Sequence, residues 1–211
     1  MAPRILEADC TCPDEKIVRE AATVIKKGGL VVAATDTLYG ILADPFNPSA
    51  VARVYDAKGR PPHKPLPLLL GESHHALLLV RPPRVFWKLA IKFWPGPLTI
   101  VAPASPNAPS HLREWERIGV RLPDAPLVRR IALRVGGVLT GTSANKSSRE
   151  SPRTVFESSS QLGDLVDLYI DCGPTLIGSP STVVDVSEEK PILFREGAIP
   201  WEKIEVVLRE E

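Results

Sequence analysis

The chain has 211 residues, with 26 basic and 25 acidic side chains and a hydrophobic content of 44%. This length and composition suit a globular protein with one sizeable core, and the net charge of +1 argues against bulk binding of polyanions. No stretch reaches the ~18 apolar residues of a membrane helix, and charged residues interrupt the N-terminus where a secretory signal would be apolar. We therefore expect a cytoplasmic protein that does not contact membranes.

Three cysteines, Cys10, Cys12 and Cys172, form a sparse set. The spacing of Cys10 and Cys12 and the lack of a nearby histidine argue against a zinc site. We expect reduced thiols, as in most cytoplasmic proteins, and no metal site built from protein ligands.

Short helices and strands alternate along the chain. Pro13 at a first helical position and the stop at Gly28 predict a helix over 13–27, and the apolar run 30–34 predicts a buried strand. Further helices are expected over 47–57, 83–93, 126–135 and 153–162, and further strands near 66–70, 98–102, 119–122, 138–141, 165–170, 182–186 and 192–195. This interleaving predicts an α/β fold in one domain spanning residues 1–211.

A basic segment follows the second predicted helix and contains Lys58, Arg60 and Lys64. Cations at a helix C-terminus are favoured by the helix dipole alone, so a solvated basic surface is one interpretation. The other is a phosphate-binding site, in which arginine gives forked donors and lysine a point charge. The residues of the segment leave both interpretations open.

Two polar positions interrupt apolar strands. Thr37 lies in the turn 35–40 after the strand 30–34, where α/β folds place ligand contacts, although such a turn also satisfies its own backbone. Arg121 is embedded in the apolar run 118–123, and a buried arginine needs a partner. An internal carboxylate and a substrate carboxylate are both open as that partner.

Ser143 and Asn145 follow the predicted strand 138–141, and on an extended segment both side chains point to one face. No histidine or aspartate has the spacing that would activate Ser143, and the nucleophile elbow, the phosphate-binding loop and the dinucleotide-binding glycine motif are all missing from the sequence. Ser143 is therefore interpreted as a hydrogen-bonding residue that binds a substrate and does not attack it.

Seven short motifs occur in one order across nearly the whole chain. They are TDTLYG at 35–40, AKGR at 57–60, WPGPLT at 94–99, VRLP at 120–123, SAN at 143–145, STVVD at 181–185 and REG at 195–197. This set resembles the signature motifs of the YrdC/Sua5 family, in its short single-domain form.

The resemblance implies a fold and an activity. The fold would be a twisted mixed sheet with flanking helices and a concave basic cleft. The activity would be that of a nucleotidyltransferase, L-threonylcarbamoyladenylate synthase, which condenses L-threonine, bicarbonate or CO₂ and ATP and releases pyrophosphate. Mg²⁺ would be bound mainly through the ATP phosphates, and the product would pass to the machinery that makes the t6A modification of tRNA.

The resemblance also assigns roles to residues. Those expected to hold threonine are Thr37, Arg121, Ser143 and Ser181, with Arg121 on the carboxylate. Those expected to hold ATP are Lys58, Arg60, Lys64, Asn145 and Arg195. The central catalytic set would be Lys58, Arg60, Ser143 and Asn145.

Two alternatives stay open at this point. The same basic surface could bind double-stranded RNA or tRNA through phosphate contacts without catalysis. A carbamoyl-adenylate-forming domain, like the related region of HypF, is a weaker alternative because the accompanying HypF regions are missing from the sequence.

Overall fold

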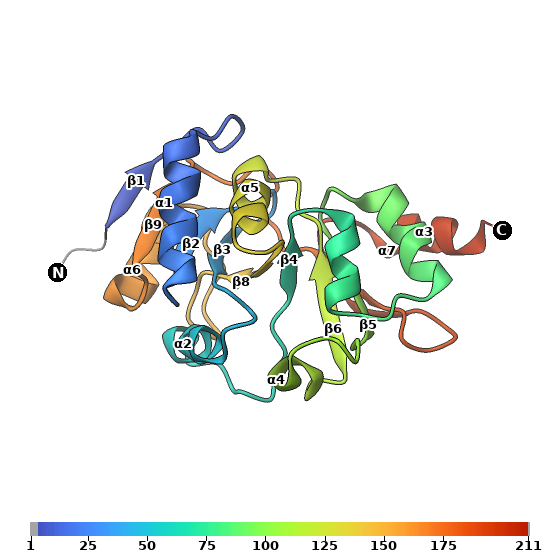
Figure 1. Ribbon diagram of the computed structural model, residues 1–211. Coiled ribbons are helices and arrows are strands. Elements are labelled where there is room, and N and C mark those ends of the chain that lie inside the picture. The colour runs from blue at the N-terminus through green and yellow to red at the C-terminus, as the bar shows by residue number, and fades with distance from the viewer. Residues whose placement is uncertain (1–3, 211) are drawn as a thin grey trace.

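The computed structural model describes residues 4–210 (Figure 1). Its helices are α1 (Glu15–Lys26), α2 (Pro48–Lys58), α3 (Arg84–Phe93), α4 (Ser110–Arg113), α5 (Pro126–Arg134), α6 (Val155–Leu162) and α7 (Trp201–Arg209), with 3₁₀ turns at Ser73–Leu78 and Gly163–Leu165. Its strands are β1 (Ile5–Glu7), β2 (Val31–Ala34), β3 (Tyr39–Leu42), β4 (Leu68–Leu70), β5 (Leu98–Pro103), β6 (Arg117–Arg121), β7 (Val138–Thr140), β8 (Thr142–Ser143), β9 (Leu168–Asp171), β10 (Thr182–Asp185) and β11 (Ile192–Arg195).

The predicted α/β class is confirmed, and each predicted helix and strand has a counterpart within a few residues. Apart from the two 3₁₀ turns, five of the described elements were missed: β1, β3, β8, α4 and α7. Strand β3 was missed because its first two residues belong to the TDTLYG motif, which reads as a turn.

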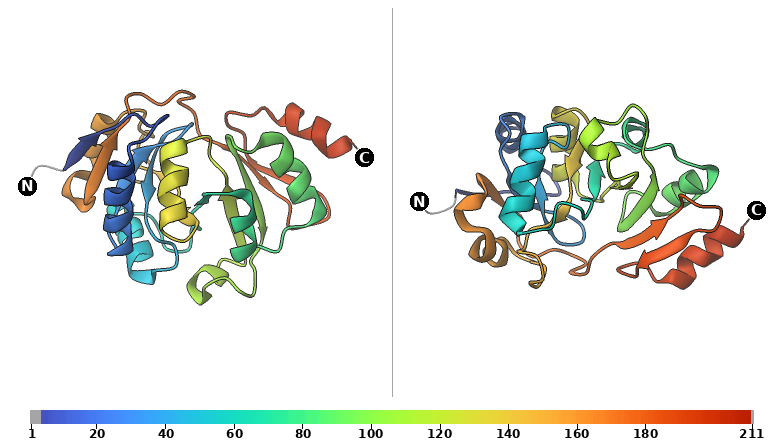
Figure 2. Two further views of the ribbon diagram at one scale, coloured as in Figure 1. Left: turned by 45° about the horizontal axis from the view of Figure 1, so that its top comes forward. Right: turned by 90° about the horizontal axis from the view of Figure 1, so that it is seen from below.

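The strands form two mixed sheets, and the expectation of one sheet is wrong. The first has the order β1-β9-β2-β3-β8 and the second the order β11-β10-β5-β6-β4-β7. The chain passes between the sheets three times: from β3 through α2 to β4, directly from β7 to β8, and by a longer segment from β9 to β10 (Figure 2). Strand order depends on long-range pairing, which local periodicity does not encode.

The first sheet is covered on both faces. In β2, Val31 and Ala33 pack in one core with α1 and α5, whereas Val32 and Ala34 pack in another with α2 and α6. This is the two-residue alternation of a strand buried on both sides, and it explains why 30–34 reads as a continuous apolar run.

The second sheet packs one face against α3 and α7, which lie together near the C-terminus in Figure 1. Ile100 of β5 and Ile118 and Val120 of β6 point into that core. The alternating positions Thr99 and Arg121 lie on the other face of the same strands, because successive side chains point to opposite sides. The pleat therefore directs polar groups away from the core.

The prediction of reduced thiols is wrong for two cysteines. Cys10 and Cys172 form a disulfide across 162 residues, with their Cα atoms 5.5 Å apart, and Cys12 is free and exposed. Parallel pairing of β1 with β9 sets Glu7 opposite Asp171, so the residues just beyond both strands meet. That proximity follows from strand order and could not be read from cysteine spacing.

Across residues 4–210, none of the helices has the length and apolar character needed to cross a membrane. The assignment of the whole chain to one domain stays a prediction.

Candidate active site

The turn between β2 and β3 is built on the hydroxyl of Thr35. Its Oγ1 accepts hydrogen bonds from the backbone N–H groups of Thr37 and Leu38, each at 3.2 Å, and lies 2.8 Å from the Leu38 carbonyl oxygen. The Thr35 side chain thus satisfies the hydrogen-bonding needs of the backbone N–H groups in its own turn. The same arrangement fixes the Thr37 hydroxyl, which lies 2.9 Å from Thr35 Oγ1.

Arg121, at the end of β6, reaches this turn from the second sheet. Its Nη2 donates to Asp36 Oδ1 at 2.9 Å and its Nη1 to Thr37 Oγ1 at 3.0 Å. Both side chains of the Arg121–Asp36 ion pair are 5% exposed. Of the two partners left open for Arg121, the internal carboxylate is therefore present.

Arg195, at the end of β11, lies over Ser181. Its Nη2 and Nε donate to the Ser181 carbonyl oxygen at 2.8 and 3.1 Å, and the Ser181 hydroxyl lies 2.8 Å from Thr99 Oγ1. Thr99 belongs to the WPGPLT motif, which forms a tight corner before β5: Trp94 Nε1 donates to the Leu98 carbonyl oxygen at 2.7 Å. The strand that leaves this corner also delivers a hydroxyl to the site.

The end of α2 positions Arg60. The helix begins at Asn47, whose side chain accepts from the N–H groups of Ser49 and Ala50, and it ends at Gly59 in the left-handed conformation with φ +58°. Arg60 leaves that end, and its Nη2 donates to the Pro65 carbonyl oxygen at 2.9 Å.

Lys58, in contrast, points into the protein and is 3% exposed. Its Nζ donates to the carbonyl oxygens of Ser143 and Asn145, the second at 2.7 Å, and lies 3.4 Å from Asn145 Oδ1. The Asn145 amide donates in turn to the carbonyl oxygens of Lys146 and Arg149, at 3.0 and 2.7 Å. The AKGR and SAN motifs are therefore in direct contact through Lys58.

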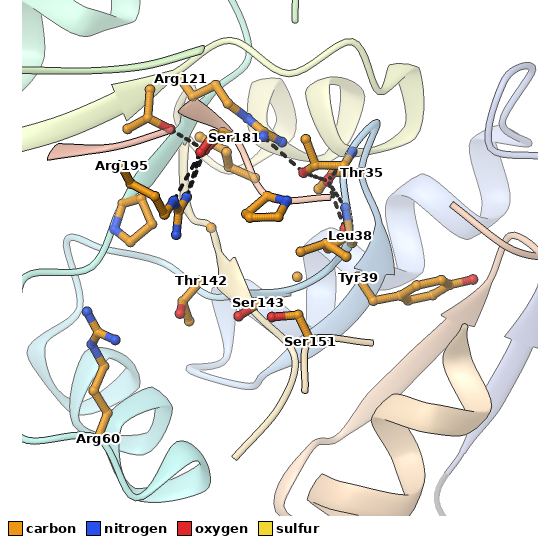
Figure 3. A pocket seen from close by; sticks show the side chains of 17 residues that line it. Thr35, Leu38, Tyr39, Arg60, Arg121, Thr142, Ser143, Ser151, Ser181 and Arg195 are labelled. Atoms are coloured by element: carbon orange, nitrogen blue, oxygen red, sulfur yellow. Dashed lines mark hydrogen bonds between the residues drawn. The ribbon is translucent and has the colours of Figure 1, made fainter. Parts of the chain in front are cut away.

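These elements surround a cavity of about 220 Å³ (Figure 3). It is lined by Thr35, Thr37, Leu38, Tyr39, Gly40, Arg60, Pro67, Leu69, Thr99, Arg121, Gly141, Thr142, Ser143, Ser151, Pro180, Ser181 and Arg195. Figure 3 shows Arg121 and Arg195 above Thr142 and Ser143, with Arg60 entering from the end of α2. Side chains from both sheets thus meet at one site.

Six predicted site residues line the cavity: Thr37, Arg60, Arg121, Ser143, Ser181 and Arg195. Lys58 and Asn145 lie behind its wall, and Lys64 is exposed outside it. Sequence reasoning had assigned no binding role to Thr99, Thr142 or Ser151, whose hydroxyl-bearing side chains also line the cavity. Thr142 adjoins the SAN motif, and this adjacency is the signal that could have identified it.

Two of the three arginines that line the cavity, Arg60 and Arg195, form no ion pair with the described residues, whereas Arg121 is paired with Asp36. Burial lowers the pKa of Arg195, and burial also lowers the pKa of Arg60, although Tyr55 opposes this shift. The pKa of Arg121 is lowered by burial and by the nearby Arg195, while Asp36 raises it. Guanidinium groups destabilised in this way favour an anionic ligand. Asp36 is not among the lining residues, and the described lining contains no carboxylate.

A close backbone approach explains the glycine of the REG motif. A Cβ atom placed on Gly197 would lie 2.3 Å from the Pro180 carbonyl oxygen and 2.6 Å from the Ser181 carbonyl carbon. Only a residue without a side chain fits there. Gly197 thus lets the turn after β11 pack against the backbone that carries Ser181.

The arrangement does not resemble a nucleophilic or metal-held site. No histidine, aspartate or glutamate lines the cavity beside Ser143 in the described part of the chain. Residues 4–210 also contain no group of three histidine, cysteine or acidic side chains that could hold a metal ion. The site offers arginines and hydroxyls, which bind and orient anions.

Comparison with known proteins gave concordant matches. The profile of the Sua5/YciO/YrdC family, described as "Telomere recombination", matches residues 23–197. The threonylcarbamoyl-AMP synthase of Halorhodospira halophila is 36% identical over 155 residues, covering 72% of this chain and 81% of that protein. The threonylcarbamoyl-AMP synthase of Pyrococcus abyssi is 34% identical over 199 residues, and the chain spans 93% of its own length but 58% of that protein.

A solved structure, P. abyssi Sua5 complexed with L-threonine, matches with a TM-score of 0.91 at 32% identity. The match covers 100% of this chain and 62% of the solved chain. The fold with two mixed sheets is thus shared with a protein that binds threonine.

Proposed function

The chain belongs to the Sua5/YciO/YrdC family, and on this basis we propose that it is an L-threonylcarbamoyladenylate synthase, a nucleotidyltransferase. The observation that carries the proposal is the cavity lined by three arginines and several serine and threonine hydroxyls, whose described lining contains no histidine or carboxylate that could activate a nucleophile. Joining ATP to the carbamate of threonine brings phosphate and carboxylate charges together, which requires positioning and charge neutralisation more than covalent catalysis.

Threonine would occupy the side of the cavity formed by the two sheet edges. Arg121 and Thr37 would receive its carboxylate, and Ser143 and Ser181 would hold its amine and hydroxyl groups. The neutral threonine amine attacks CO₂ and loses a proton, or attacks bicarbonate and releases water, and either route gives the carbamate.

ATP would lie toward the end of α2. Arg60 follows α2 and Arg195 ends β11, and both side chains line the cavity, where they are suited to bind the triphosphate. Lys64, which is exposed outside the cavity, would be a further contact. A carbamate oxygen attacks the α-phosphorus and pyrophosphate leaves, so negative charge on the phosphates has to be neutralised. Lys58 and Asn145, which lie behind the cavity wall, would hold the backbone of the SAN motif in place on the ATP side.

Mg²⁺ would arrive bound to ATP. The described lining contributes hydroxyls and arginines but no carboxylate, so these residues do not fit a protein-held Mg²⁺ ion. The phosphate oxygens would supply its ligands, and the residues described above account for binding and orientation.

We propose a cytoplasmic location, because ATP and tRNA are found there. A disulfide is compatible with that location in hyperthermophiles, whose intracellular proteins are rich in disulfides. The adenylate would pass to the enzyme that modifies tRNA, and direct contact with tRNA or double-stranded RNA stays a prediction from the sequence.

The test is pyrophosphate release from ATP in bicarbonate buffer with and without L-threonine. We expect release that depends on threonine, with serine and valine as matched controls for the substrate side chain. Pyrophosphate release that is independent of threonine, or no release from a folded protein, would contradict the proposal.

A further inference from the structure

The ion pair between Arg121 and Asp36 joins the two sheets at the cavity. Arg121 ends β6 in the second sheet, and Asp36 follows β2 in the first. Only Arg121 of the two lines the cavity. Asp36 therefore lies behind the arginine, on the side away from a bound substrate.

We propose that Asp36 is a positioning residue for threonine binding, which acts by holding the Arg121 guanidinium in the orientation that receives the substrate carboxylate. The inference rests on the proposed function. It assigns Asp36 a role in substrate affinity that differs from stabilising the turn in which it lies.

The hydrogen bonds of Arg121 support this role. Asp36 occupies one N–H of Nη2 and Thr37 one N–H of Nη1. Arg121 Nε has no partner among the residues described, and each Nη carries a second N–H. Two fixed contacts at one edge of a planar fork orient the remaining donors.

The charges around Arg121 support it as well. Burial and the neighbouring Arg195 both lower the pKa of Arg121, and the Asp36 carboxylate is the group that raises it. With Asp36 present the pair is neutral overall, and Arg121 stays protonated beside a second arginine. Removing the Asp36 charge would leave the buried Arg121 guanidinium uncompensated and close enough to Arg195 to be repelled by its charge.

The backbone of Asp36 is held in place independently of its side chain. The N–H of Ile177 donates to the Asp36 carbonyl oxygen at 3.1 Å, and the N–H of Gly178 to the Thr37 carbonyl oxygen at 3.0 Å. A substitution that keeps the shape of Asp36 thus leaves the turn its backbone contacts. Any change in threonine KM in such a variant can therefore be assigned to loss of the carboxylate charge.

The decisive variant is Asp36→Asn, which keeps an acceptor oxygen and removes the charge. We expect the KM for threonine to rise about tenfold while the KM for ATP stays within about twofold. Asp36→Glu restores the charge and should recover part of the loss. A threonine KM within about twofold of the wild type in folded Asp36→Asn would overturn the proposal.

A matched control comes from the same strand. Arg117 of β6 pairs with Asp185 of β10 at 2.8 Å, and Asp185 is buried, but neither residue lines the cavity. Asp185→Asn should lower the melting temperature without raising the threonine KM. An equal rise in threonine KM in both variants would mean that loss of a buried charge pair, not positioning of Arg121, causes the effect.

A second comparison decides the matter if Asp36→Asn alone does not fold. The double variant Arg121→Gln, Asp36→Asn removes both charges of the pair, so no unpaired buried charge is left. Because Asp36 acts through Arg121, threonine KM should be the same in Arg121→Gln and in the double variant. A further rise of about tenfold in the double variant would show a separate role and overturn the inference.

The wild-type protein distinguishes failure of this inference from failure of the proposed function. If calorimetry detects no threonine binding to the wild type and pyrophosphate release does not depend on threonine, the proposed function fails. If both are present in the wild type and unchanged in Asp36→Asn, the inference alone fails.

Discussion

Lys58 Nζ lies 2.7 Å from the carbonyl oxygen of Asn145, so the lysine of the AKGR motif holds the backbone of the SAN motif. It also donates to the Ser143 carbonyl oxygen, and the N–H of Ser147 donates back to the Lys58 carbonyl oxygen at 2.8 Å. Two segments separated by more than 80 residues are thus connected behind the cavity wall. The lysine organises the site from outside the cavity.

This geometry predicts how Lys58→Met should behave. Ser143 lines the cavity and Asn145 follows it, so loosening their backbone should raise the KM for both threonine and ATP by about fivefold each. A direct phosphate contact would raise the ATP KM alone. Steady-state kinetics with each substrate varied separates the two outcomes, and Lys92→Met, an exposed lysine in the last turn of α3, is the matched control.

The charge of Lys58 also predicts a pH dependence of stability. Burial, reinforced by Arg60, lowers the pKa of Lys58 to about 7. The unfolded chain keeps this proton until about pH 10, so between these values the unfolded state binds more protons and the folded state gains stability as pH rises.

We therefore expect wild-type stability to rise by about 1–2 kcal/mol between about pH 7 and pH 9, relative to Lys58→Met. Denaturant unfolding at both pH values measures the difference. Parallel pH profiles of the two proteins would contradict the assigned pKa.

Two of the three cavity arginines, Arg60 and Arg121, should each serve one substrate. Arg60→Ala should raise the KM for ATP by about tenfold or more, and Arg121→Ala should do the same for threonine. Arg121→Ala also leaves Asp36 buried and unpaired, so its free energy of unfolding should fall by about 3–5 kcal/mol, whereas Arg60, which is less buried, should matter less. Wild-type turnover in both variants would refute the assigned positions.

The disulfide predicts a loss of stability on reduction. Cys10 and Cys172 close a loop of 162 residues, and cross-links of this kind restrict the unfolded chain. Cys172→Ser should lower the free energy of unfolding by about 2–4 kcal/mol, and a thiol reductant should lower the melting temperature of the wild type but not of the variant. Cys12→Ser, at an exposed free thiol, is the control and should leave the melting temperature unchanged.

The sequence predicted features that depend on local chemistry. The helix expected over 47–57 agrees with α2 to within one residue, and Arg121 in an apolar strand required a partner, which the structure supplies as Asp36. Lys58 shows the limit of such reasoning: a lysine beside a helix end suggests a phosphate contact, but its acceptors are backbone carbonyl groups more than 80 residues away. The division into two sheets and the disulfide could not be predicted from the sequence either, because both depend on which strands pair.

Gly197 provides the last prediction. The Cβ atom of Gly197→Ala would meet the backbone of Pro180 and Ser181 at less than 3 Å, and backbone moves less easily than a flexible side chain. Overpacking of this kind destabilises by about 1–3 kcal/mol, and here the atoms that must shift carry Ser181 and the carbonyl oxygen that binds Arg195. The variant should therefore lose threonine-dependent turnover at a temperature where it is still folded. Near-wild-type turnover with a lowered melting temperature would show that the site tolerates displacement of Ser181, and that Gly197 serves packing alone.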